Sequence, residues 1–149
     1  MKMLSDRLGV KGRVRVVVRD AETGRIIEER SVENLVVNIG KNHIADLIIG
    51  ASTDSFTHCA VGSGTTQPTA TDLASPIGER KQYTDRFRTN NIATFSFFFS
   101  SGDNNGVWSE CGLFTAASRG AMLSRALFTP SIVKDSTKTV TVEWDITIG

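Results

Sequence analysis

The chain has 149 residues, 17 lysines and arginines against 16 aspartates and glutamates, and 40% hydrophobic residues. This length and composition predict one globular domain with a substantial core, and the net charge of +1 supplies no general attraction for nucleic acid. No segment reaches the roughly 20 apolar residues of a membrane-spanning helix, so we expect neither a membrane segment nor a signal peptide. The basic cluster Arg80, Lys81, Arg86 and Arg88 is typical of a solvated strand face, so nucleic acid is not an expected partner.

A β-hairpin is predicted near the N-terminus. Val14, Val16 and Val18 alternate with arginines, residues 20–24 have turn chemistry, and residues 25–32 return with isoleucines and charges. Such a hairpin is barely stable alone in water, so it must join a larger sheet or lie against another subunit.

The valine face of this hairpin needs a cover. We interpret the three valines as candidate assembly residues, covered by a neighbouring subunit or another protein. The charged side chains of the hairpin fit equally well the solvated face of an edge hairpin. The sequence thus predicts an arm and hairpin over residues 1–33 and a β-sandwich domain over residues 34–149.

A short helix is predicted over residues 43–49, after an apolar bridge at residues 34–39. Asn42 is its expected N-cap and Gly50 its C-terminal stop. A helix of this length needs a sheet to pack on, and we expect His43 in its first turn to be structural or solvated.

A strand over residues 56–61 is predicted to enter a glycine-rich turn at Gly62 and Gly64. The turn lacks the Lys-Thr ending of a P-loop and the third glycine of a dinucleotide fingerprint, which favours a tight turn over a phosphate site. Residues 65–76 are rich in threonine, alanine and proline and predict a surface loop that carries contacts.

Two further strands are predicted over residues 82–88 and 92–100, with a turn at residues 90–91 between them. In the second strand three phenylalanines at alternate positions share one face and indicate core packing, whereas Phe98 points to the other face. The polar loop at residues 101–106 does not match the spacing of a calcium-binding loop.

Residues 107–114 form the segment around which we expect the domain to be organised. Trp108 fits a core position, whereas Glu110 is a lone carboxylate in an apolar strand. Because a buried unpaired charge is costly, Glu110 should accept hydrogen bonds from backbone or arginine donors, or face an opening. Gly112 predicts a bulge or a close backbone approach, with a bend that aims Glu110 inward.

Cys59 and Cys111 each lie in an apolar, strand-like setting. We expect buried free thiols, and a disulfide between the two stays open as the alternative. The cysteines and the two histidines lack the close paired spacing of a zinc site, so no metal and no cofactor is predicted.

The last two strands are predicted over residues 121–128, where Pro130 breaks the pattern, and over residues 139–148. The final strand has the clearest period-two alternation in the chain, with Trp144 on its apolar face. Together these elements predict a mainly β fold: an antiparallel β-sandwich or jelly roll with one short helix and an N-terminal β-hairpin.

Several short motifs occur in a fixed order between residues 34 and 148. They are N-L-V-V-N-I-G-K-N-H-I-A-D-L-I, C-A-V-G-S-G-T-T-Q-P-T-A-T-D-L, S-E-C-G-L-F, A-L-F-T-P and V-T-V-E-W-D-I-T-I. In this order they resemble a widespread group of tailed-phage virion proteins, similar to tail-collar and tail-fibre proteins. The resemblance implies a structural building block, most often a tail component such as a collar, fibre or baseplate protein, without catalytic residues.

The resemblance also implies partners and a location. It predicts a homo-oligomer, by analogy a trimer, that joins other virion proteins after synthesis in the host cytoplasm. A capsid decoration protein is one alternative, and a carbohydrate-binding module that recognises a host-surface glycan is another. Sugar binding usually requires exposed aromatic residues, whereas both tryptophans sit in core-like alternation. An enzyme would need a convergent acid-base or nucleophile set that the sequence does not offer, so we expect a non-enzymatic protein.

Overall fold

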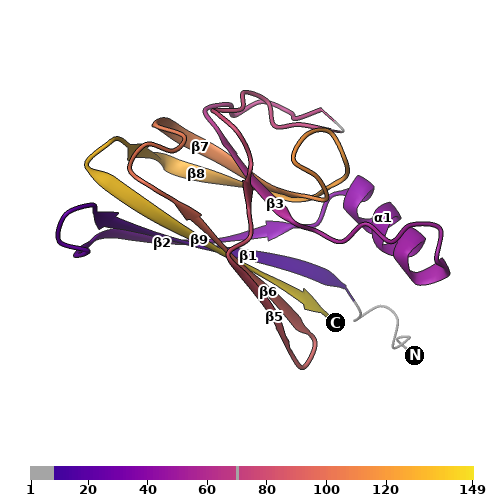
Figure 1. Cartoon of the computed structure of the whole chain (residues 1–149). Coiled ribbons are helices and arrows are strands. Elements are labelled where there is room, and N and C mark those ends of the chain that lie inside the picture. The colour runs from indigo at the N-terminus through magenta and orange to yellow at the C-terminus, as the bar shows by residue number, and fades with distance from the viewer. Residues whose placement is uncertain (1–8, 70) are drawn as a thin grey trace.

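The computed structural model describes residues 9–69 and 71–149, which form two antiparallel β-sheets and one helix (Figure 1). In chain order the elements are β1 (Val10–Asp20), β2 (Ile26–Leu35), α1 (Asn38–Ile49), β3 (His58–Gly62), β4 (Lys81–Gln82), β5 (Asp85–Thr89), β6 (Ile92–Phe99), β7 (Gly106–Phe114), β8 (Met122–Lys134) and β9 (Lys138–Ile148). A five-stranded sheet has the order β2-β1-β9-β6-β5, and a four-stranded sheet has the order β4-β3-β7-β8.

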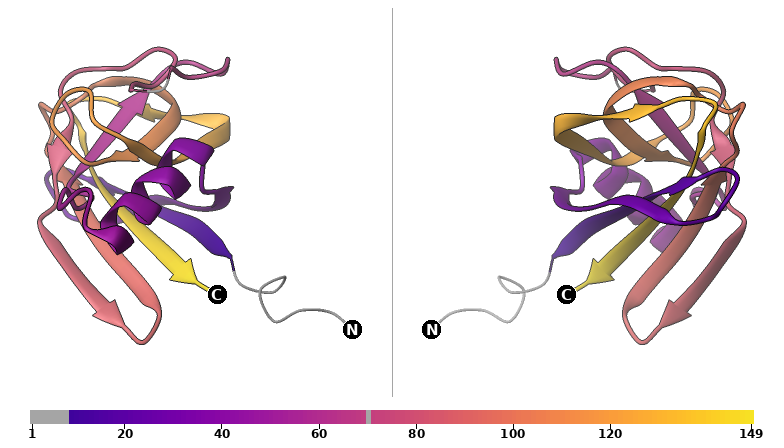
Figure 2. Two further views of the ribbon diagram at one scale, coloured as in Figure 1. Left: turned by 90° about the vertical axis from the view of Figure 1, so that its right-hand side faces the viewer. Right: turned by 90° about the vertical axis from the view of Figure 1, so that its left-hand side faces the viewer.

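The main core lies between the two sheets (Figure 2). Val16, Phe97 and Val142 of the five-stranded sheet are fully buried, as are Leu113 and Ile132 of the four-stranded sheet. Because side chains alternate between the faces of a strand, each sheet contributes every second residue to this core. The predicted mainly β, sandwich-like fold with one short helix and an N-terminal hairpin is therefore confirmed.

The N-terminal hairpin is part of the sandwich. β1 pairs with β9 along its whole length as well as with β2. Val14, Val16 and Val18 are at most 1% exposed and belong to the core of this same chain. The interpretation that a neighbouring subunit covers these valines is therefore wrong, and of the two alternatives the hairpin has joined the main sheet.

This placement also changes the meaning of the predicted boundary between residues 33 and 34. The five-stranded sheet continues across the boundary, because β1 lies between β2 and β9. Residues 1–8 of the predicted arm lie outside the described residues.

Helix α1 begins earlier than expected. It starts at Asn38 after an N-cap at Val37, which has extended backbone angles, and Lys41 donates its backbone N–H to the Val37 carbonyl. Asn42 is thus an interior residue and not the N-cap. Gly50 ends the helix as predicted, in the left-handed conformation with φ 78°, which glycine adopts without steric cost.

The predicted strand over residues 82–88 is divided between the two sheets. β4 pairs with β3 in the four-stranded sheet, whereas β5 pairs with β6 in the five-stranded sheet. The crossing takes place at Tyr83 and Thr84, whose backbone N–H groups donate to Thr57 and Ser96 respectively. One polar run therefore supplies the edge strands of both sheets.

Strand β8 does not end before Pro130, as the sequence predicted, but continues through it to Lys134. β8 is the outer strand of its sheet, and proline is tolerated at such an edge because its missing N–H leaves no ladder hydrogen bond unmade. The irregular pairing of β8 with β7 also falls here, since Trp108 pairs with Ile132 and Glu110 with Leu127.

Candidate functional site

The candidate site is the outer face of the four-stranded sheet at Glu110. The pairing of β7 with β8 is irregular between Trp108 and Glu110, where β8 has more residues than β7. Without this irregularity these two residues would share a face, because they are two positions apart. With it, Trp108 is buried in the main core, whereas Glu110 lies beneath the loop over residues 63–76.

The irregularity that turns Glu110 away from the main core lies at Ser109 and not at Gly112, although a second register shift follows Gly112, between Leu113 and Phe114. Gly112 itself pairs regularly with Ala60 and Arg125. The sequence also offered a close backbone approach at Gly112. The atoms that come close there are those of side chains, since a Cβ at Gly112 would lie 2.9 Å from the Phe114 ring and 3.0 Å from Leu73. A side chain at this position would displace the apolar residues under the loop.

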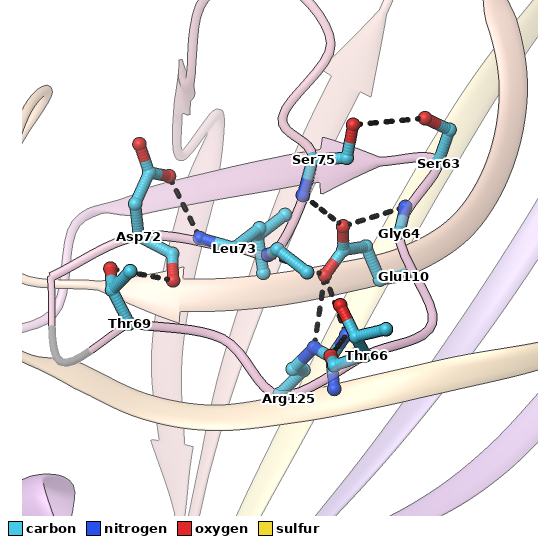
Figure 3. A network of polar contacts seen from close by, with 10 residues as sticks. Ser63, Gly64, Thr66, Thr69, Asp72, Leu73, Ser75, Glu110 and Arg125 are labelled. Carbon is cyan, nitrogen blue, oxygen red and sulfur yellow. Dashed lines mark hydrogen bonds and ion pairs between the residues drawn. The ribbon is translucent and has the colours of Figure 1, made fainter.

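Glu110 is fully buried and accepts five hydrogen bonds (Figure 3). Its Oε2 accepts from the backbone N–H groups of Gly64 and Ser75, both at 2.8 Å. Its Oε1 accepts from the Ala74 N–H at 3.1 Å, and from Arg125 Nε at 3.0 Å and Nη2 at 2.8 Å. The predicted backbone and arginine partners of Glu110 are thus present, and they offset the cost of burying its charge.

Arg125 extends the same network to Thr66, further along the first arm of the loop. Besides the Glu110 carboxylate, its Nη2 donates to the Thr66 carbonyl at 2.7 Å. Glu110 and Arg125 thus hold both arms of the loop, at Gly64 to Thr66 and at Ala74 to Ser75. We call this set of contacts the Glu110 clasp.

A second arginine, which the sequence did not single out as structural, holds the remaining part of the loop. Arg80 stacks its guanidinium 3.6 Å from the centre of the Phe114 ring and donates to the carbonyls of Thr71, Ala116 and Arg119. Its side chain is only 7% exposed, so it does not contribute to a solvated basic face. The sequence signal was weak, because an arginine between two polar residues reads as a surface residue.

Beneath the loop lies a second apolar cluster, separate from the main core. It consists of Ala60, Leu73, Phe114 and Met122, with Val37 packed against it. Leu73 is 2% exposed, although it belongs to a segment that the sequence predicted as a surface loop. Residues 63–69 and 71–76 are therefore a third layer of the fold, fixed by apolar contacts and by the clasp.

The glycines of the turn at Gly62 and Gly64 leave space for the Glu110 carboxylate. A Cβ at Gly64 would lie 2.6 Å from Glu110 Oε2 and 2.6 Å from the Ala74 Cβ, and a Cβ at Gly62 would lie 2.6 Å from the same oxygen. The glycines let the backbone approach the carboxylate closely enough for the Gly64 N–H to donate. The turn thus holds an anion, as glycine-rich turns often do, but the anion is the protein's own side chain.

Replacing Gly64 with alanine should lower the free energy of unfolding by about 1 to 3 kcal/mol, because the added methyl group displaces the carboxylate or Ala74. Gly102→Ala is the matched control, since a Cβ there meets no atom within 4 Å. Urea denaturation of both variants measures the difference. Equal stability of the two variants would show that the close approach at Gly64 is not a packing constraint.

The two thiols lie side by side in the main core. Cys59 is opposite Leu113, and Cys111 is opposite Val61, so the cysteines are diagonal neighbours on adjacent strands. Both are buried and free, as expected from the sequence, and no disulfide joins them. Burial raises the pKa of Cys59 to about 12 and raises the pKa of Cys111 as well.

Alkylation of the folded protein with iodoacetamide at about pH 8 should therefore leave both cysteines unmodified, since a thiol of raised pKa carries little thiolate. Unfolding in urea should make both reactive, and intact-mass spectrometry would count the adducts. Rapid modification of either cysteine in the folded protein would contradict this burial.

The chemistry of the site is that of a structural clasp. Both oxygens of Glu110 already accept hydrogen bonds, and its side chain is closed to solvent. Trp108 and Trp144 are also fully buried, so neither can stack on a sugar. Within residues 9–69 and 71–149, no group of three or more His, Cys, Asp or Glu side chains is placed to hold a metal ion.

Comparisons with known proteins identify no relative of this chain. No family model, no curated protein and no solved structure matches the chain. In the part of the chain that the structure describes, no helix has the length and hydropathy to span a membrane.

Proposed function

We propose that the chain is a non-enzymatic structural protein of a tailed phage particle, located in the tail as a collar, fibre or baseplate component. It assembles through contacts with copies of itself and with other virion proteins. The observation that carries this proposal is that three of the motifs resembling phage virion proteins contribute residues to the Glu110 clasp or to the apolar cluster beneath the loop.

Residues of three motifs take part, and one further residue directly precedes a fourth motif. Gly64, Thr66 and Leu73 belong to C-A-V-G-S-G-T-T-Q-P-T-A-T-D-L, and Glu110 belongs to S-E-C-G-L-F. Arg125 directly precedes A-L-F-T-P, and Val37 of the first motif packs against the cluster under the loop. The motif residues thus build the support of one loop, which is what a structural role requires.

A loop that is held in this way is suited to make protein contacts. Its outer side exposes short polar side chains, namely Ser63, Thr65, Thr66, Gln67, Thr69 and Thr71. Because the backbone is already fixed, little conformational entropy is lost when such a surface binds a partner. The clasp therefore supports a role in which residues 63–69 and 71–76 present a preformed contact surface.

Locating the protein in purified particles tests the proposal. After heads and tails are separated, quantitative mass spectrometry should find this chain in the tail fraction at a fixed copy number. Its presence in the head fraction alone would favour the capsid decoration alternative. Its absence from purified particles would overturn the proposal, and glycan-array binding by the isolated protein would then favour host-glycan recognition.

A pair of surface variants tests the role of the loop. Gln67→Lys and Ser136→Lys introduce the same charge at exposed polar positions, one in the loop and one in the turn between β8 and β9. We expect Gln67→Lys to reduce incorporation into particles and Ser136→Lys to leave it unchanged. Equal incorporation of both variants would show that the loop is not a contact surface.

A further inference from the structure

We propose that copies of this chain assemble head to tail through the two open edges of the five-stranded sheet, with β5 of one copy beside β2 of the next. This inference rests on the proposed function only in that both require subunit contacts. The β2 and β5 edges are the surfaces that make one such contact.

β2 and β5 are the two outer strands of the same sheet. In the described residues, the backbone hydrogen bonds of residues 26–34 and 85–89 run to β1 and β6 respectively, and none runs to a further strand. β2 also contacts β8, and Val36 just after it bridges Ser124, so the open part of the β2 edge is its N-terminal part. An edge of this kind presents unpaired N–H and C=O groups that can pair with another strand. The β5–β6 hairpin also projects beyond the body of the sandwich, which leaves its edge accessible (Figure 2).

The directions of the two strands suit a head-to-tail contact. Every neighbouring pair in the order β2-β1-β9-β6-β5 is antiparallel where the pairings are described, so β2 and β5 run in the same direction. When a second copy continues the sheet in the same orientation, its β2 lies parallel to β5 of the first. The second copy therefore extends the sheet by an ordinary parallel pairing.

The side chains of β5 disfavour pairing of β5 with itself. In an antiparallel pairing centred on Phe87, Arg86 of one copy would face Arg88 of the other, and like charges in this position repel. The charges of the β2 edge complement β5 instead. When Phe87 is aligned with Ile27 of the next copy, Asp85 meets Arg25 and Arg88 meets Glu28.

The apolar residues at the two edges are complementary as well. Ile26 and Ile27 are each 48% exposed on β2, and Phe87 is 51% exposed on β5. A groove of about 260 Å³ lies beside β5, and it is lined mainly by apolar side chains, among them Leu47, Phe56 and Phe95. An isoleucine of the β2 edge has the size and chemistry to enter this groove, which would remove exposed apolar surface on both copies from water.

A contact between two different edges is heterologous, so an open assembly keeps an unpaired β2 edge at one end and an unpaired β5 edge at the other until it closes. Such contacts form a ring when the rotation between copies closes and a filament when it does not. The proposed occupant of each edge is thus a second copy of this chain.

Charge reversal tests the pairing of Arg88 with Glu28. Native mass spectrometry and light scattering of the purified full chain should show an oligomer for the wild type. Arg88→Glu and Glu28→Arg should each abolish it at concentrations where the wild type is assembled. The double variant Arg88→Glu/Glu28→Arg should restore it, because each contact again joins opposite charges.

Arg13→Glu is the matched control, since Arg13 is exposed on the interior strand β1 and should leave the oligomer intact. Thermal unfolding establishes that each variant is folded. A wild type that stays monomeric at the highest soluble concentration overturns the proposal, as does an oligomer that neither reversal affects. Disruption by Glu28→Arg alone, without an effect of Arg88→Glu, would indicate a contact between two β2 edges and also overturns it.

These outcomes are independent of the location in particles. If the chain occurs in purified tails and the isolated protein is monomeric, the proposed function stands and edge pairing fails. If the isolated protein forms the edge-paired oligomer and is absent from particles, edge pairing stands and the proposed function fails.

Discussion

Replacing Glu110 with alanine is expected to lower the free energy of unfolding by about 3 to 5 kcal/mol, because it removes one partner of a buried ion pair. Arg125 would lose its carboxylate partner, and the N–H groups of Gly64, Ala74 and Ser75 would lose their acceptors. Urea denaturation of the purified variant measures the loss.

Glu29→Ala is the matched control for this substitution. Glu29 pairs with Arg15 at 2.9 Å, but its side chain is 47% exposed. Exposed ion pairs contribute about 1 kcal/mol or less, so this variant should be nearly as stable as the wild type. A loss at Glu110 no larger than that at Glu29 would show that the clasp contributes little to stability.

Glu110→Ala should also release the loop that contains Gly64 and Ser75. Because the loop is held by few apolar residues, its opening requires less free energy than global unfolding. Hydrogen exchange of the Gly64 and Ser75 amides should accelerate in Glu110→Ala while the amides of β9 stay protected. Uniform acceleration across the chain would mean that the loop and the sandwich unfold together.

Replacing Trp144 with alanine is expected to cost about 3 to 5 kcal/mol or to abolish soluble expression. Trp144 is fully buried in β9, the central strand of the five-stranded sheet, where it pairs with Val14 and Phe95 of the two neighbouring strands. Truncation to alanine leaves a large cavity that a sheet with strands on both sides cannot close.

Phe98→Ala is the control for Trp144→Ala. Phe98 lies in the adjacent strand β6 but points to the outer face and is 43% exposed. Its truncation should cost roughly 1 kcal/mol or less, as most surface substitutions do. A melting temperature of Trp144→Ala equal to that of Phe98→Ala would contradict the central position of Trp144 in the core.

The sequence by itself determined the features that depend on local periodicity. The alternation in residues 139–148 predicted both β9 and the burial of Trp144, and the phenylalanines of β6 predicted its core face. Gly50 predicted the end of α1, because the left-handed conformation there suits glycine. Glu110 was recognisable as a carboxylate in need of partners, because a buried charge requires them in any fold.

Only the tertiary structure decided which groups supply those partners. Gly64 and Arg125 are 46 and 15 residues from Glu110 in the sequence, and no local pattern relates them. The irregular pairing at Ser109 decided which face of the sheet Glu110 occupies, since Trp108 and Glu110 lie on opposite faces although they are two residues apart.

Which surface buries the valines of the hairpin was likewise determined only by the tertiary structure. The alternation of valines in β1 predicts an apolar face but does not say which surface buries it. Insertion of β1 between β2 and β9 placed Val14, Val16 and Val18 in the core of the same chain. The physical reason is that a strand's own sequence specifies which residues need burial, whereas the pairing of strands distant in the chain specifies what buries them.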